Sequence, residues 1–191
     1  MIAPRLFSDS ATRRAASSER LNREGIFSKL DIHFAFLMTR LSGEYDQNLF
    51  LASALVSRSA QEGNICLDLT EFSGKRLLEA EGSEPPVICP ELVEWTDSLM
   101  QRRVVGREES ACPMILDLKN RLYLRRFWEY EKNLADSILK RTGVKRSGID
   151  ESRIRALLNL LFPESGNANP DLQALAVLSA FLTSFCVISG G

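Results

Sequence analysis

A short apolar run that ends in two glycines is the part of the sequence whose residue types could bind a phosphate. Residues 185–188 read Phe-Cys-Val-Ile, a pattern typical of a strand buried on both faces, and Ser189 leads from them into Gly190 and Gly191. Glycines let backbone amides approach a phosphate closely, as they do in nucleotide-binding loops. Many tight turns have the same composition, so this pattern alone does not identify a nucleotide site.

A helix predicted just upstream makes these glycines more informative. Asn169 is expected to cap this helix, Pro170 suits its first position, and Asp171 favours the positive end of its dipole. Apolar residues then recur at helical spacing over residues 172–182. With Gln173 in its first turn, this order of helix, apolar strand and Gly-Gly resembles the start of the first motor domain in superfamily 1 helicases of the RecD family, the alpha subunit of exodeoxyribonuclease V.

That resemblance implies nucleotide binding by three residues of a longer parent protein. In such helicases the glutamine, here Gln173, reads the adenine edge, and Gly190 and Gly191 would open the Walker A loop. ATP and Mg²⁺ are therefore expected in a parent ATP-dependent DNA helicase. The chain, cut two residues into the motif on this interpretation, lacks the lysine and the Ser/Thr that contact phosphate and Mg²⁺. We expect it to bind neither and to hold no catalytic or metal-binding residues.

Earlier segments of the chain carry further features of the same family, so the resemblance covers residues 27–191. A helix at 27–41, the sequence Leu-Ala-Ser-Ala-Leu-Val-Ser at 51–57 and a strand segment at 63–69 follow one another as in the RecD amino-terminal domain. Residues 120–131 resemble the segment that closes this domain. The resemblance implies that the domain docks the helicase subunit onto the gamma (RecC-like) subunit of the complex, and that the parent complex binds DNA.

The expected fold class is α+β and mostly helical. It comprises a helical amino-terminal domain with a small antiparallel sheet, followed by the first helices and first strand of a P-loop motor domain. Apolar periodicity predicts helices at 27–41, 46–60, 90–101, 150–162 and 172–182, and one that begins near residue 125. Short β-candidates occur at 65–69, 104–105, 114–116 and 121–124, with a hairpin turn at 117–120. The proline-rich segment 79–90 is expected to be a loop.

The first two predicted helices differ in where their apolar residues lie. One face of the first helix collects five large apolar residues, namely Phe27, Leu30, Phe34, Leu37 and Leu41. His33 lies off this stripe, and we expect it to be structural or exposed rather than catalytic. Residues 46–60 are apolar nearly all round, so the second helix should be central to the core.

From these segments we predict that the chain is divided into four parts. Residues 1–26 form an amino-terminal extension, residues 27–141 the interaction domain, residues 142–149 a basic linker, and residues 150–191 the start of a truncated motor domain. The length of 191 residues fits one large or two small domains.

Charge is distributed unevenly, although the formal net charge is only −1. Glu62 to Asp117 holds twelve acidic and five basic residues, a net charge of −7, whereas Lys119 to Arg155 holds eleven basic and five acidic residues, a net charge of +6. We call the second segment the basic region. The asymmetry fits either two solvated faces of opposite sign or a face that meets a partner or a phosphate.

Three arginines of the basic region offer an alternative to docking. Arg121, Arg125 and Arg126 alternate with Tyr123 and Trp128, as in a stacking platform for single-stranded DNA. Aromatic residues at helical spacing more often belong to a core, and these arginines more often pair with acidic residues of the same chain. Direct DNA binding is thus the second hypothesis, and a mostly helical globular domain with a chance Gly-Gly terminus is the third.

Several other classes of protein are not indicated. The four cysteines form no Cys-x-x-Cys pair, and the single histidine supplies no further ligand, so neither a zinc ribbon nor a disulfide framework is expected. Free thiols suit a reducing cytoplasm, where we expect the protein. No apolar run approaches about 18 residues, and the amino terminus lacks the features of a secretory signal, so we expect no membrane partner.

Overall fold

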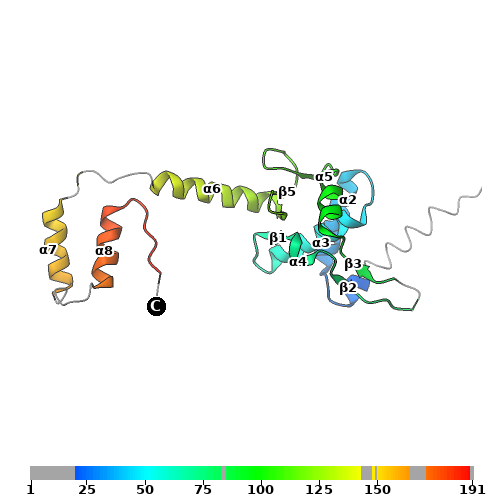
Figure 1. The fold of residues 1–191 in the computed structure, drawn as a ribbon, viewed down its shortest axis with the longest axis horizontal. Helices are drawn as coiled ribbons and strands as arrows, with labels where there is room; N and C mark the ends of the chain where they lie inside the picture. The colour runs from blue at the N-terminus through cyan, green and yellow to red at the C-terminus, as the bar shows by residue number, and fades with distance from the viewer. Residues whose placement is uncertain (1–19, 83–84, 143–147, 149, 164–170, 190–191) are drawn as a thin grey trace, which may run out of the picture. The chain divides into compact units, whose positions relative to one another are not determined.

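The computed structural model describes residues 20–82, 85–142, 148, 150–163 and 171–189 (Figure 1). The chain divides into two compact units, residues 1–129 and 130–191, and each is described by itself. The hydrophobic core of the first unit is formed by helices α2, α3 and α5 and by a four-stranded sheet.

Helix α2 (Lys29–Ser42) has clear signals at both ends. The Ser28 hydroxyl accepts a hydrogen bond from the Asp31 amide, and the Asp31 carboxylate accepts one from the Ser28 amide, which completes a capping box. Gly43 ends the helix in the left-handed conformation with a φ of 97°. The helix predicted at 27–41 is therefore confirmed, with Phe27 in the core just before it.

Helix α3 (Gln47–Gln61) is the centre of the first unit, as predicted. The Asp46 side chain caps it by accepting from the Leu49 amide at 2.7 Å, and every residue from Leu49 to Ser57 is buried. Helix α5 (Leu92–Met100) packs against α3 through Trp95, whose indole Nε1 donates to the Asn48 carbonyl at 3.0 Å. The helix predicted at 90–101 is confirmed.

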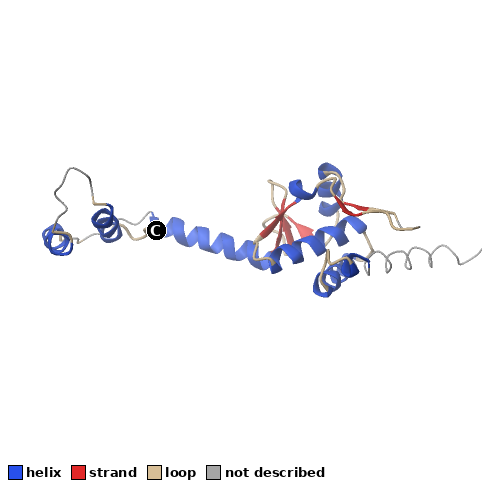
Figure 2. Cartoon of the chain, turned by 90° about the horizontal axis from the view of Figure 1, so that it is seen from below, coloured by secondary structure: helices blue, strands red, loops and turns tan. Residues whose placement is uncertain are grey.

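The sheet has the strand order β1-β6-β5-β4, with β1 (Cys66–Asp68) and β4 (Val105–Gly106) at its edges. Figure 2 draws the strands of the first unit in red among its helices. β6 (Arg121–Leu124) pairs antiparallel with β1 and with β5 (Met114–Leu116). β4 pairs parallel with β5, so the expectation of a purely antiparallel sheet is wrong at this edge. The chain returns to the same direction within a tight loop in which a Cβ on Gly106 would collide with the Ser110 hydroxyl.

The turn between β5 and β6 is organised by a buried carboxylate. Asp117 accepts hydrogen bonds from the amides of Lys119 at 2.8 Å and Arg121 at 2.9 Å, and its other oxygen accepts from Arg121 Nε at 2.7 Å. Asn120 has a φ of 62°, which a tight hairpin turn requires. The predicted hairpin turn at 117–120 is confirmed.

The sequence did not predict two small elements of the first unit. The short helix α4 (Leu69–Phe72) follows β1 directly, and β2 (Arg76–Leu78) pairs with β3 (Val87–Ile88) around part of the loop expected at 79–90. Arg20 is buried and donates to the carbonyls of Glu79 and Pro85. These bonds fasten the start of the described chain to the β2–β3 hairpin.

Helix α6 (Arg125–Thr142) follows β6 without a break, and the second unit contains α7 (Glu151–Leu161) and α8 (Leu172–Leu182). All three confirm predicted helices. The cap of α8 is Asp171, whose carboxylate accepts from the amides of residues 173 and 174, whereas Asn169 and Pro170 lie outside the described residues. Most of the predicted linker, including residues 143–147, lies outside them as well.

The strand predicted at residues 185–188 is not formed. These residues have neither helical nor strand structure, and Val187 and Ile188 are exposed. A buried parallel strand needs neighbouring strands on both sides, and no sheet occurs among the described residues of the second unit. An apolar composition therefore did not suffice to make a strand here.

Burial of the Cys89 thiol predicts a loss of stability at alkaline pH. Burial raises its pKa from the ordinary 9.0 to about 11, against a smaller lowering by Lys75. Between these two values the unfolded chain loses the thiol proton and the folded chain keeps it, so stability falls as the pH rises. We expect denaturant unfolding to show a loss of up to about 3 kcal/mol through this window that Cys89→Ala lacks. Cys112→Ala keeps the Cys89 thiol and should show the full loss of stability. The same loss in Cys89→Ala would contradict the assignment of the effect to Cys89.

Candidate functional site

Helix α2 turns a row of apolar side chains away from the core. Leu30 is 61% exposed, Leu37 40% and Leu41 52%, and Phe34 between them is half-buried. We call these four residues the α2 outer face. An apolar stripe on a helix ordinarily faces the core, but here the stripe recognised in the sequence lies largely on the surface.

The opposite side of α2 explains this orientation. Its buried residues are Asp31, Ile32, Ala35, Met38 and Thr39, and it packs along α3. The two polar members are satisfied inside the protein. Asp31 accepts from Gln61 Nε2 at 2.5 Å in addition to its capping bonds, and the Thr39 hydroxyl donates to the Phe36 carbonyl at 3.0 Å. Their burial therefore costs little, and the larger apolar residues are left for the surface.

A groove of about 470 Å³ runs along one side of the α2 outer face. Its walls are mainly apolar and include Leu30, Phe34, Pro113 and Leu124, while Arg125 and Arg126 line it from the start of α6. Helix α2, the end of α3 and residues 113–126 thus contribute to one depression within the first unit. Apolar walls with a few polar groups are typical of a recognition groove.

A second groove, of about 550 Å³, lies on the other side of the α2 outer face. It is lined by His33, Phe36, Leu37 and Arg40, and by Tyr45 from the connection to α3. The Phe36 ring meets Phe50 edge-on with centroids 5.1 Å apart, which fixes its position. His33 is exposed, in agreement with the structural or exposed role expected for it. The α2 outer face therefore borders both grooves, since Leu30 and Phe34 line the first and Leu37 lines the second.

The structure places the three predicted arginines in different surroundings. Arg121 pairs with Asp117 through two nitrogens, each 2.7 Å from the carboxylate, and this hydrogen bond raises the pKa of Arg121. Arg125 donates to the Ser110 carbonyl at 2.5 Å and pairs with Glu129 at 3.1 Å. Arg126 is exposed and lies over the Phe127 ring, 4.6 Å from its centroid. Arg125 and Arg126 meet at the first groove, and Arg121 does not line it.

The aromatic residues between these arginines are less accessible than a stacking platform requires. Tyr123 is fully buried, and its ring meets Trp128 edge-on at 5.0 Å. A base could not stack on Tyr123 without opening the core. Within the basic region, Arg121 and Arg125 are thus paired with carboxylates of the same chain, and the Tyr123 ring is buried.

Of the three predicted nucleotide-binding residues, Gln173 alone lies among the described residues. Gln173 is exposed in the first turn of α8, and its amide donates to Asp171 at 2.9 Å. Gly190 and Gly191 lie outside the described residues. In the part of the chain that the structure describes, no three His, Cys, Asp or Glu side chains gather as metal ligands, and no helix is long and apolar enough to cross a membrane.

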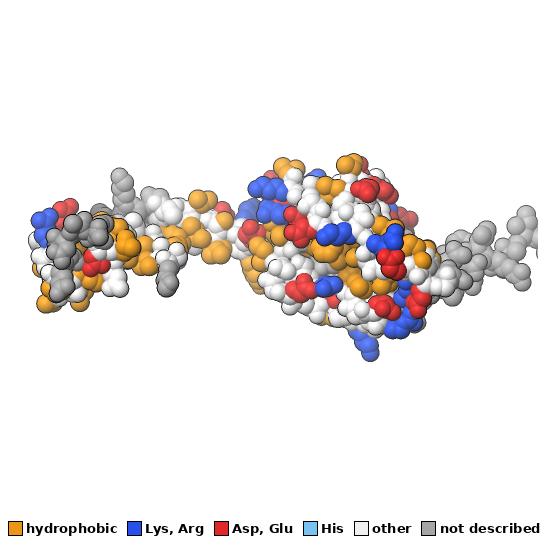
Figure 3. Space-filling model, turned by 60° about the horizontal axis from the view of Figure 1, so that its bottom comes forward, with side chains coloured by type: hydrophobic (Ala, Val, Ile, Leu, Met, Phe, Trp, Pro, Cys, Tyr) orange, Lys and Arg blue, Asp and Glu red, His pale blue; other side chains and the backbone are white. Residues whose placement is uncertain are grey.

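The surface of the first unit carries both signs of charge around apolar side chains. Figure 3 shows hydrophobic side chains between Lys or Arg and Asp or Glu side chains on the visible face of this unit. Such a mixture resembles protein-binding surfaces more than an extended basic stripe for nucleic acid.

Comparison with known proteins agrees with the extent of the first unit. Residues 23–123 match the family described as RecBCD enzyme subunit RecD, N-terminal domain. A RecBCD enzyme subunit RecD of Mycolicibacterium smegmatis is 28% identical over 131 residues, which cover 68% of this chain and 22% of that protein. A protein of the same name from Mycobacterium tuberculosis is 25% identical over 186 residues, which cover 96% of this chain and 29% of that protein. The chain thus spans between a fifth and a third of the length of these relatives.

Proposed function

The chain belongs to the RecD family and carries its amino-terminal domain, and from this premise we propose that it is a docking module for the gamma (RecC-like) subunit of a RecBCD-type complex. The matching relatives are each named as a subunit of the RecBCD enzyme. A domain of such a subunit needs a surface that holds it in the assembly. The α2 outer face and its two grooves supply a surface of the appropriate kind.

The observation that carries this proposal is the exposure of three leucines on one helix. Leu30, Leu37 and Leu41 recur at helical spacing on the outside of a capped and well-packed helix. Isolated exposed leucines are ordinary, but a row of them beside two grooves is typical of a surface that another protein covers. Fully covering one leucine contributes about 1.5–3 kcal/mol, so a few such contacts can dominate an interface.

We assign the remaining family features to a longer parent protein. That parent is an ATP-dependent DNA helicase of the exodeoxyribonuclease V complex, acting in DNA repair and recombination in the cytoplasm. Its motor binds ATP and Mg²⁺ through Gln173 and a loop that opens at Gly190 and Gly191. Support for this assignment is the resemblance of the carboxyl-terminal segment and the length of the relatives.

Direct binding of single-stranded DNA is the second candidate. The net charge of +6 in the basic region favours it. The pairing of Arg121 with Asp117 and of Arg125 with Glu129 reduces the charge that is free to meet phosphates, and burial removes Tyr123 from stacking. Arg126 remains as the most accessible of the three predicted arginines.

Salt dependence separates the two candidates. The 191-residue chain is titrated with the cognate gamma subunit and, separately, with single-stranded DNA at several salt concentrations. We expect affinity for the gamma subunit to change less than about threefold between about 0.1 M and 0.5 M salt, because apolar burial is little screened. The affinity for DNA should be low and should fall steeply as the salt concentration rises, because added salt reduces the free energy gained when counterions are released from the DNA. Tight DNA binding without gamma-subunit binding would replace docking by the second candidate.

A further inference from the structure

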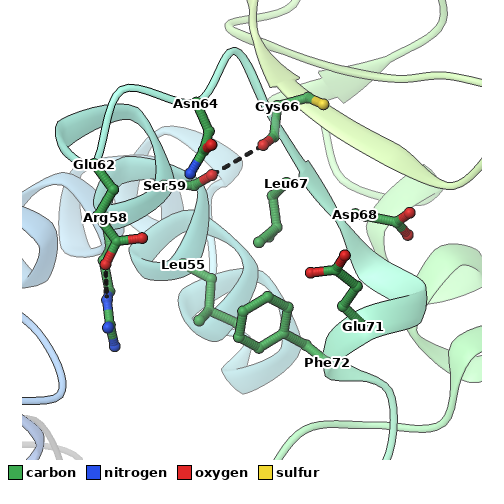
Figure 4. Close-up of a pocket in the computed structure, with 10 residues that line it drawn as sticks. All are labelled: Leu55, Arg58, Ser59, Glu62, Asn64, Cys66, Leu67, Asp68, Glu71 and Phe72. Atoms are coloured by element: carbon green, nitrogen blue, oxygen red, sulfur yellow. Dashed lines mark hydrogen bonds and ion pairs between the residues drawn. The ribbon is translucent and has the colours of Figure 1, made fainter.

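A third recess lies in the first unit beside the free edge of β1, apart from the two grooves along α2. This cleft has a volume of about 340 Å³ and lies between the carboxyl-terminal half of α3, strand β1 and helix α4 (Figure 4). The Ser59 hydroxyl donates to the Cys66 carbonyl at 2.9 Å and joins α3 to β1 at one end of it. We call it the β1 cleft.

The floor of the β1 cleft is apolar and carries an aromatic ring. Leu55 and Leu67 are buried, and Phe72 is half-buried. The Phe72 ring already attracts a cation of its own chain, since Lys75 Nζ lies 5.6 Å from the ring centroid. The chemistry of this ring therefore favours a cation beside it.

Three carboxylates line the cleft, and two of them are engaged within the chain. Glu62 accepts from Arg58 Nε at 2.7 Å. Asp68 accepts from the Thr70 amide at 2.9 Å and from its hydroxyl at 2.6 Å, which caps α4. Figure 4 shows the Asp68 carboxylate pointing away from α3 and the Arg58 guanidinium at the far end of the cleft.

Glu71 is the third carboxylate of the cleft, and it is not engaged in this way. It is exposed, and it has neither a hydrogen bond nor an ion pair from its side chain among the described residues. Figure 4 shows its carboxylate and the Phe72 ring both directed toward α3. The cleft thus combines a carboxylate whose oxygens are not engaged by other described residues, an aromatic ring and an apolar floor.

We propose that the β1 cleft binds one arginine side chain of a partner protein. A guanidinium is planar, forms paired hydrogen bonds with a carboxylate and stacks on an aromatic face, so Glu71 and Phe72 together match it. The methylene groups of the same side chain would cover Leu55 and Leu67. A single free carboxylate fits one monovalent cation and offers too few oxygen ligands for a calcium ion.

The proposal is tested by titrating the isotope-labelled 191-residue chain with N-acetyl-arginine amide and recording backbone amide NMR shifts. N-acetyl-citrulline amide, which has nearly the same shape without the charge, is the matched ligand control. We expect saturable shifts confined to α3, β1 and α4 with the arginine derivative and at least fivefold weaker binding of the citrulline derivative.

Three variants test whether the arginine derivative binds in the β1 cleft. Glu71→Gln should weaken arginine binding at least fivefold, whereas Glu94→Gln, which removes an exposed carboxylate from α5 outside the cleft, should leave it unchanged. Phe72→Leu keeps an apolar floor and should also weaken binding. Equal shifts with both ligands, equal binding of N-acetyl-lysine amide, or full binding by Glu71→Gln would overturn the proposal.

Discussion

Replacing Leu37 and Leu41 together by serine is expected to weaken binding of the chain to the gamma subunit at least tenfold. Both side chains are exposed on the α2 outer face, so their removal leaves no cavity in the free domain. Each substitution removes part of the roughly 1.5–3 kcal/mol of binding free energy that covering a leucine contributes in the complex. Since each 1.4 kcal/mol corresponds to about tenfold in affinity, the effect is readily measured by titration calorimetry or sedimentation.

Leu118→Ser is the matched control for this experiment. Leu118 is 85% exposed in the turn between β5 and β6, away from α2 in the sequence, and lines neither groove. The control should bind the gamma subunit like the unchanged chain, and all three proteins should unfold at similar denaturant concentrations. Unchanged affinity in the Leu37 and Leu41 variant would remove the α2 outer face from the interface.

Trp95→Ala is expected to destabilise the first unit by about 3–5 kcal/mol, a large part of the stability of a small domain. The Trp95 side chain is completely buried between α5 and the core, and its Nε1 donates to the Asn48 carbonyl. The substitution leaves a large cavity and removes the hydrogen bond from Nε1 to the Asn48 carbonyl, and both effects lower the stability of the folded state. Chemical denaturation followed by circular dichroism measures the change.

Val93→Ala on the same helix separates this packing effect from a change in helix propensity. Val93 is 72% exposed, so its truncation should alter stability by less than about 0.5 kcal/mol. A loss below 1 kcal/mol in Trp95→Ala would mean that α5 does not belong to the cooperative core.

Local signals in the sequence predicted much of this fold. The apolar run of α3, the cap residue Asp46 and the turn residues around Asp117 each indicate a structure that forms through short-range bonds. The parallel pairing of β4 with β5 depends on a loop that folds back around Gly106, and no periodicity reveals such a path. The short β2–β3 pair was missed because proline-rich sequence argued for a loop.

The candidate site was harder to predict than the fold. The stripe of Leu30, Phe34, Leu37 and Leu41 is visible in the sequence, but its exposure depends on which side of α2 meets α3. Buried Asp31 is the residue that could have indicated the orientation, because its capping bonds and its bond to Gln61 satisfy it inside the domain. A prediction from apolar periodicity assigns polar residues such as Asp31 to the surface. It therefore could not show which face of α2 is buried.

The carboxyl-terminal segment illustrates the opposite limitation. Residues 185–188 have the composition of a buried strand, but a strand is stabilised by its neighbours and not by its own sequence. Gln173 lies on a helix as predicted, and its role toward a nucleotide stays a prediction.

The most direct measurement of docking is hydroxyl-radical footprinting of the chain alone and in its complex with the gamma subunit. This method labels side chains according to their access to solvent, and mass spectrometry locates the labels. We predict that labelling of Leu30, Leu37 and Leu41 falls strongly in the complex, while labelling of Val93 and Leu118 does not change. Unchanged labelling of α2 in a complex that forms would contradict the assignment of this face as the docking surface.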